Sequence, residues 1–261
     1  MKSNKVKNAK KINKQYEDIS SSMKNCIKYI ERHDDYLPDD LCEYLIEKFE
    51  ELKEKGFGYK GRTAGVKRIG DKLYSSSKSN LESKNSYDIY MQPVFSKIFD
   101  DWKEKETLLN KYIQVIVCNY IVSHGLAGVE NIGGGLLEYM KENELNNIQK
   151  TFNYQNYCIR KYDRYVGQFK SLHSDVGMST VRRVCAVLIY LNDVEEGGET
   201  IFPVLGEKVT PKKGRVVIFP SYFTHYHYAS IPMSSDKYVI CIHINYNNTD
   251  KLENNNEKEK K

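Results

Sequence analysis

The distribution of hydrophobic and polar residues divides the chain into a helical first half and a strand-rich second half. Apolar residues recur at helical spacing within residues 39–55, acids occupy the first turn, and Gly56 follows as a stop signal, which predicts a helix. Helical periodicity also predicts a helix over about residues 108–123 and a shorter one around residues 136–140. Residues 56–91 show little periodicity, so we expect a long loop there that leaves room for edge strands.

From residue 156 onward the pattern changes to short β-branched and aromatic runs separated by turn residues. No helical period lies between these runs, which favours a sandwich or a barrel. The expected strands occupy approximately residues 157–163, 167–175, 182–192, 199–202, 215–219, 225–229 and 237–246.

Composition and charge restrict the class of protein further. No stretch approaches the roughly 18 apolar residues of a membrane helix, so we expect a soluble chain without a membrane partner. The formal net charge of +5 arises at the ends, because residues 1–14 hold six lysines and no acid, whereas residues 247–261 hold four lysines and four acids. The residues between them carry 30 basic and 31 acidic groups, which argues against a nucleic-acid partner. Both ends are expected to be disordered: a basic arm and a tail.

The cysteines give no sign of a disulfide framework or a zinc knuckle, since no C-x-x-C pair occurs and most have apolar neighbours. We expect buried thiols in a reducing compartment, and therefore a cytoplasmic protein. The six cysteines are Cys26, Cys42, Cys118, Cys158, Cys185 and Cys241.

The strand-rich half contains a candidate metal site. Residues two apart on a strand face the same side, so the side chains of His173 and Asp175 are expected to converge. A structural hydrogen-bonded pair has the same pattern, and the metal interpretation therefore needs a third ligand. His225 and His227 both follow the turn after a later strand, and either can supply it.

A lysine at the start of the last strand is a second unusual feature. Lys237 lies ten residues after His227 and leads into a strongly apolar run. An isolated buried charge is costly, so we expect Lys237 to have an anionic partner. His243 shares its strand parity with Lys237 and is expected to be a hydrogen-bonded core histidine.

Together these features resemble the iron(II)- and 2-oxoglutarate-dependent dioxygenases, and specifically their prolyl 4-hydroxylase-like branch. The most specific element is the run YLNDVEEGGET at residues 190–200. It stands between the His-x-Asp pair and a Gly-Arg strand that ends in Phe-Pro, after which come a histidine and, ten residues on, a lysine. The resemblance covers approximately residues 155–246.

The resemblance implies an α+β fold with a double-stranded β-helix (jelly-roll) core and supporting N-terminal helices. The catalytic core is expected over residues 151–246. The helical support region and loops of residues 15–150 are expected to form one domain with it.

The resemblance also implies a set of catalytic metal ligands. Two imidazoles and one carboxylate on one face of Fe(2+) are diagnostic of non-heme iron oxygenases. His173, Asp175 and His227 are the implied ligands. His227 is preferred over His225 because the ten-residue spacing to Lys237 belongs to His227.

For the cofactor 2-oxoglutarate, the resemblance implies that Lys237 and the hydroxyl of Thr200 bind the far carboxylate. Tyr162 is the candidate for a tyrosine that assists upstream of the His-x-Asp pair. Tyr190 is a further candidate, although strand parity leaves its direction open and a core aromatic is the alternative. Ascorbate is a further cofactor that this branch admits.

The implied reaction is the hydroxylation of an unactivated C–H bond in a peptidyl or free amino acid, with molecular oxygen consumed and succinate and CO2 released. Fold alone does not establish this activity, because jelly rolls also serve as binding modules. One alternative is therefore a catalytically silent module that binds a metal or a peptide. The other is an oxygenase of the same superfamily that acts on nucleic acid or a small metabolite.

Overall fold

The computed structural model describes residues 29–69, 72–79, 81–124, 152–154 and 157–247. No helix within these ranges is long and apolar enough to cross a membrane. The expected basic arm, the short helix around residues 136–140 and the tail from residue 248 lie outside the described residues.

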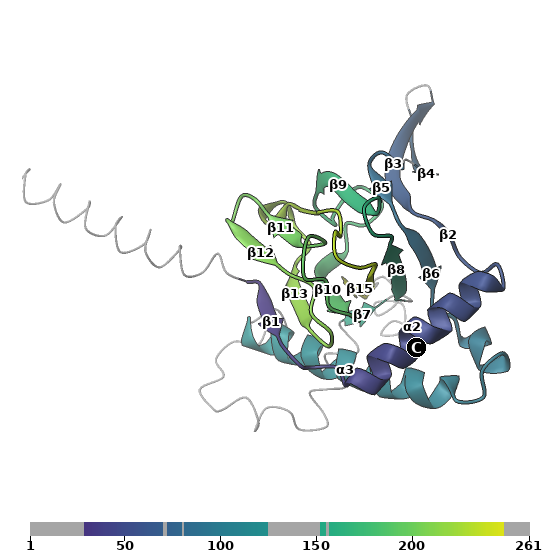
Figure 1. The fold of residues 1–261 in the computed structure, drawn as a ribbon. Coiled ribbons are helices and arrows are strands. Elements are labelled where there is room, and N and C mark those ends of the chain that lie inside the picture. The colour runs from purple at the N-terminus through teal and green to yellow at the C-terminus, as the bar shows by residue number, and fades with distance from the viewer. Residues whose placement is uncertain (1–28, 70–71, 80, 125–151, 155–156, 248–261) are drawn as a thin grey trace, which may run out of the picture.

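The larger sheet is the middle layer of the fold and is antiparallel throughout (Figure 1). Its strands are β1 (Glu31–His33), β2 (Tyr59–Lys60), β6 (Tyr87–Tyr90), β7 (Phe152–Tyr154), β8 (Cys158–Tyr162), β10 (Arg183–Tyr190), β13 (Val216–Pro220) and β15 (Lys237–Tyr246). They lie in the order β1-β13-β10-β15-β8-β6-β2, and β7 also pairs with β15.

The smaller sheet holds five antiparallel strands, and a separate hairpin extends from the body. The strands of the smaller sheet are β5 (Lys84–Asn85), β9 (Gln168–His173), β11 (Thr200–Phe202), β12 (Glu207–Val209) and β14 (His227–Ala229). Their order is β12-β11-β14-β9-β5. The hairpin consists of β3 (Arg62–Ile69) and β4 (Lys72–Ser79).

Two α-helices, α2 (Asp39–Glu54) and α3 (Trp102–Ser123), cover the outer face of the larger sheet (Figure 1). Short 3-10 turns, η1 (Pro93–Lys97) and η2 (Phe223–His225), complete the helical elements that the described ranges contain. Helix α2 begins at the predicted residue. Helix α3 begins earlier than predicted, because its first turn is anchored by the buried Trp102, while the polar residues that follow Trp102 hide the period in the sequence.

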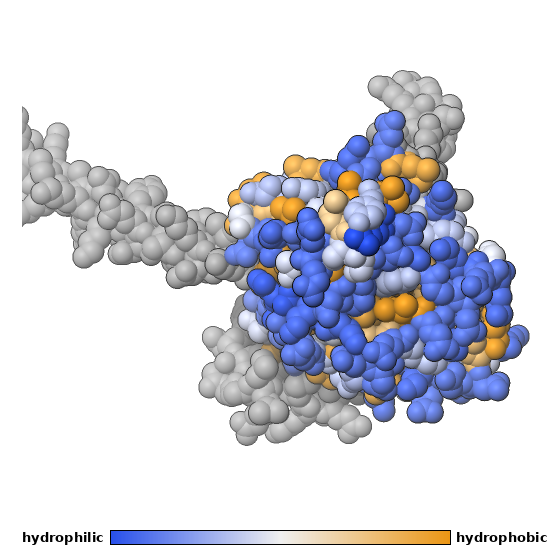
Figure 2. Space-filling view, viewed as in Figure 1, coloured by the Kyte–Doolittle hydropathy of each residue, from blue (hydrophilic) through white to orange (hydrophobic). Residues whose placement is uncertain are grey.

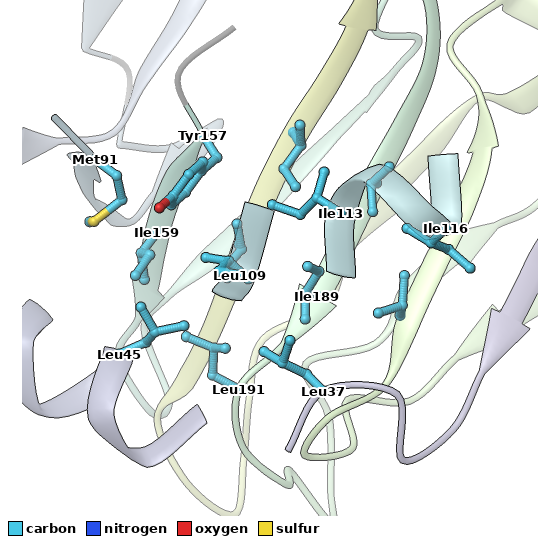
Figure 3. Close-up of a cluster of buried hydrophobic side chains, with 14 of the residues drawn as sticks. Leu37, Leu45, Met91, Leu109, Ile113, Ile116, Tyr157, Ile159, Ile189 and Leu191 are labelled. Carbon is cyan, nitrogen blue, oxygen red and sulfur yellow. The ribbon is translucent and has the colours of Figure 1, made fainter. Parts of the chain in front are cut away.

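The main hydrophobic core lies between the helices and the larger sheet. Figure 3 shows Leu109, Ile113 and Ile116 of α3 over Ile159 and Ile189 of the sheet. All five side chains are at most 1% exposed. Burial of this surface fixes the outer face of β8, β10 and β15, so the alternate residues of these strands must point the other way, into the space between the sheets.

A second, smaller core lies between the two sheets. It joins Tyr190 and Val239 of the larger sheet to Phe202 and Val209 of the smaller one. Two antiparallel sheets that enclose a common interior, with helices outside one of them, form a double-stranded β-helix. The predicted jelly-roll fold with supporting helices is confirmed.

The segment between the helices contains more strand than the sequence indicates. Residues 56–91 hold β2 to β6 rather than one long loop. These strands are short or run at sheet edges, and β4 has the sequence KLYSSSKS, which lacks apolar alternation. Strand β12 also has no counterpart in the predictions, because its three residues, EKV, contain a single apolar side chain.

The face of the molecule in Figure 2 is largely hydrophilic, and apolar residues appear on it in small groups. Scattered apolar residues are normal on a protein surface. The chemically distinctive groups lie instead in the interior, between the sheets.

Candidate active site

Three potential metal ligands meet at one end of the smaller sheet. His173 ends β9, Asp175 follows two residues later, and His227 begins β14, where it pairs directly with His173. One ligand atom from each of these residues lies within 4.8 Å of the others. The structure thus brings together the three predicted ligands.

Backbone hydrogen bonds orient both imidazoles. The Nδ1 atom of His173 donates to the carbonyl oxygen of Ser171 at 2.7 Å, and Nδ1 of His227 donates to the carbonyl oxygen of His225 at 3.0 Å. A proton fixed on Nδ1 leaves the lone pair on Nε2 free, which is the arrangement that a metal-binding histidine requires.

The electrostatic environment keeps His173 and Asp175 in the protonation states that bind a cation. Burial lowers the pKa of His173 to about 4, with a further contribution from His227, so the imidazole of His173 is neutral at neutral pH. Burial opposes ionisation of Asp175, but the neighbouring imidazoles of His243, His227 and His173 outweigh it and lower the pKa of the carboxyl. Two imidazoles and a carboxylate fit Fe(2+) with open positions on its other face.

The aspartate is also held from outside the ligand set. Nε2 of His243 lies 3.2 Å from Oδ1 of Asp175, and the backbone carbonyl of Asp175 accepts a hydrogen bond from Nη1 of Arg183 at 3.0 Å. His243 was expected to be a hydrogen-bonded core histidine, and its partner proves to be Asp175. The sequence offered one signal for this placement, the shared strand parity of His243 and Lys237.

His225, the alternative third ligand, lies outside the ligand group. Its side chain is buried, and its Nδ1 lies 2.8 Å from Oγ1 of Thr224. Its Nε2 is buried without a hydrogen-bond partner in the described part of the chain. The residue contributes to the site through its backbone carbonyl, which orients His227.

The ligand group opens into a cavity between the two sheets. The cavity is also lined by the four predicted cosubstrate-binding residues, Tyr162, Tyr190, Thr200 and Lys237. Strand pairing places Lys237 opposite Tyr162 at the start of β15, and the hydroxyl of Tyr190 lies 2.8 Å from Oγ1 of Thr200. Tyr190 therefore points inward, which the sequence left open.

Lys237 is the unusual charge of this cavity. Its side chain is buried, its Nζ donates to the carbonyl oxygen of Gly198 at 2.7 Å and lies over the ring of Tyr162, and among the described residues no carboxylate is within 4.0 Å. Burial lowers the pKa of Lys237 to about 8. An ammonium held in this way favours an anionic ligand.

The chain is similar to several known proteins. The sequence model of the 2OG-Fe(II) oxygenase superfamily matches residues 158–245. A probable prolyl 4-hydroxylase 9 from Arabidopsis thaliana is 34% identical over 90 residues, which are 28% of this chain and 31% of that protein. The chain thus spans about a third of the length of that relative.

Solved structures show the same fold at lower sequence identity. A prolyl hydroxylase from Trichoplax adhaerens, in complex with a hypoxia inducible factor peptide fragment, has a TM-score of 0.54 at 16% identity, over 89% of this chain and 91% of that chain. A prolyl-4-hydroxylase from Pseudomonas putida has a TM-score of 0.50 at 14% identity, over 83% and 92%. Residues 158–245 thus match the sequence model of the 2OG-Fe(II) oxygenase superfamily, and the chain is similar to prolyl 4-hydroxylases.

Proposed function

We propose that the protein is an Fe(2+)- and 2-oxoglutarate-dependent dioxygenase that hydroxylates an unactivated C–H bond of a peptidyl or free amino acid. One observation carries the proposal: the His173, Asp175 and His227 ligand group shares a cavity with the buried ammonium of Lys237. A metal-binding end and a cationic end in one cavity suit a cosubstrate with a chelating group and a distant carboxylate.

The residues that line the cavity would have separate binding roles. His173, Asp175 and His227 would hold the metal, which supplies oxygen activation when bound. Lys237 would bind the far carboxylate of 2-oxoglutarate, assisted by the hydroxyl of Thr200, whose position Tyr190 fixes through its own hydroxyl. Tyr162 would cover the ammonium with its ring. In the balanced reaction, one atom of O2 enters the hydroxylated product and the other enters succinate, with loss of CO2.

The proposal that the substrate is a peptidyl or free amino acid rests on the similar proteins. The similar proteins are named prolyl hydroxylases, and the Trichoplax structure holds a peptide fragment. Ascorbate stays a prediction from the family resemblance.

We also propose that residues 15–150 and 151–246 form one domain. Strands β1, β2 and β6 from the first segment extend the larger sheet, and α2 and α3 share their core with it. A cytoplasmic, reducing location is proposed because Cys42, Cys118, Cys158, Cys185 and Cys241 are all buried free thiols.

Anaerobic titration of the full chain with Fe(2+) and then 2-oxoglutarate tests the function. We expect a weak visible charge-transfer band, followed on admission of air by succinate release and, with a peptide and amino-acid pool, by a product 16 Da heavier in mass spectrometry. The matched control is Asp175→Ala, which removes the carboxylate ligand. A wild-type protein that folds but yields neither band nor succinate would instead be a silent binding module.

A further inference from the structure

A largely buried arginine beside the ligand group has no part in the function proposed above. Arg160 lies in the middle of β8, where it pairs with Asp88 of β6 and Val239 of β15 (Figure 1). It lies two residues before Tyr162 on the same face of the strand and lines the same cavity. Only 16% of its side chain is exposed.

The carboxylate nearest to Arg160 already has other partners. Lys84 donates from Nζ to Oδ2 of Asp88 at 2.5 Å, and Ser86 donates from its hydroxyl to Oδ1 at 2.6 Å. Nε of Arg160 lies 3.6 Å from Oδ2, beyond hydrogen-bond distance, and is buried without a hydrogen-bond partner among the described residues.

This arrangement leaves a surplus positive charge in the cavity wall. The buried Lys84 and the largely buried Arg160 share the single carboxylate of Asp88. The other cation of the cavity, Lys237, is assigned to 2-oxoglutarate, and Asp175 is assigned to the metal. A guanidinium that only shares a counter-charge is costly in such a place, so an anionic ligand would be stabilised there.

We propose that Arg160 is a specificity-determining residue that binds a carboxylate group of the substrate. This inference rests on the proposed function, which already uses both carboxylates of 2-oxoglutarate elsewhere. The planar fork of a guanidinium matches a carboxylate with two parallel hydrogen bonds. The substrates that fit are free or C-terminal amino acids and peptides with an acidic residue close to the hydroxylated carbon.

A panel of matched pairs tests the assignment on the full-length protein loaded with Fe(2+) and 2-oxoglutarate. Each pair contains an N-acetyl amino acid and its carboxamide, or a prolyl peptide with Glu and the same peptide with Gln. Succinate release by the wild-type protein without any panel compound is measured first and tests the proposed function by itself. We then expect the carboxylate member of a pair to stimulate turnover and yield the hydroxylated product.

In Arg160→Gln, the preference for the carboxylate over the amide is expected to fall at least about tenfold in kcat/KM, as the loss of a charge-assisted bond predicts. Arg160→Lys keeps the charge without the fork and is expected to retain part of the preference. Equal use of both members by the wild-type protein, or an undiminished preference in Arg160→Gln, overturns the assignment.

Thermal unfolding of the metal-free protein separates recognition from a structural role. Lys84→Gln is the matched control, because it breaks the close pair with Asp88 and should lower Tm. Arg160→Gln leaves that pair intact and removes the surplus charge, so its Tm should equal or exceed that of the wild-type protein. A loss of Tm in Arg160→Gln as large as that in Lys84→Gln would show that Arg160 serves the fold instead.

Discussion

Nζ of Lys237 lies 4.6 Å from the centre of the Tyr162 ring, directly across the β8–β15 register. Lys237 and Tyr162 line the positively charged end of the cavity, which can attract a carboxylate. An aromatic face attracts an ammonium, but it does not neutralise the charge as a carboxylate would. Burial therefore dominates, and the pKa of Lys237 falls to about 8, well below the ordinary value for lysine.

This lowered pKa predicts how 2-oxoglutarate affinity depends on pH. Below about pH 8 Lys237 is charged and the affinity should be constant. Above that value the free protein loses the proton that binding requires, so the dissociation constant should rise, approaching about tenfold per pH unit. Anaerobic calorimetry with Mn(2+) in place of Fe(2+) measures the dissociation constant of 2-oxoglutarate. Lys237→Arg stays charged and should show no such rise, and a wild-type affinity that stays constant up to pH 9.5 would refute the role of Lys237.

The hydroxyl pair of Tyr190 and Thr200 predicts a coupled effect on stability. Thr200→Val keeps the volume but leaves the buried Tyr190 hydroxyl without its 2.8 Å partner, which should cost about 1–3 kcal/mol of unfolding free energy. The double variant with Tyr190→Phe removes both polar groups and should recover most of that loss. Urea denaturation of the four proteins measures the cycle, and additive losses would contradict the coupling.

The sequence predicted the strands of the core well because hydrophobic burial dictates them. Strands β10, β13 and β15 consist almost entirely of buried residues, so their apolar runs are visible without any partner. Strands β1, β7 and β12 have three residues each and owe their existence to pairing with neighbours. Within residues 56–91, β2 and β5 lie at sheet edges, β3 and β4 form the separate hairpin, and β6 has only four residues, so their apolar pattern is weak for a similar reason.

The residues of the candidate site also differ in how far the local sequence predicts their positions. Asp175 follows His173 by two residues, just past the end of β9, so their short separation along the chain brings them together. Arg160 approaches Asp88 only through the β6–β8 register, and no local pattern encodes that register. The role proposed for Arg160 depends on such a long-range contact, which is why the substrate class could not be predicted from spacing.

The position of His225 outside the ligand group predicts a clear difference between two neighbouring histidines. His227→Gln should weaken binding of Mn(2+) or Fe(2+) by about a hundredfold or more, because one of the three proposed protein ligands is lost. His225→Gln keeps the backbone carbonyl that orients His227 and should bind the metal within a few-fold of the wild-type protein. Anaerobic metal titration compares the two, and the reverse order of affinities would exchange their roles.

Because His243 contacts Asp175, we expect His243 to position this proposed ligand without touching the metal. Nε2 of His243 lies 3.2 Å from Oδ1 of Asp175 and can hold the carboxylate so that Oδ2 faces His227, 3.9 Å away. His243→Phe fills similar space but cannot donate, and metal affinity should fall about 10–100-fold, the usual cost of losing such a partner. His243→Gln keeps a donor and should recover part of the affinity. Metal titration and Tm are read together: a loss of Tm without a loss of metal affinity would assign His243 to packing alone.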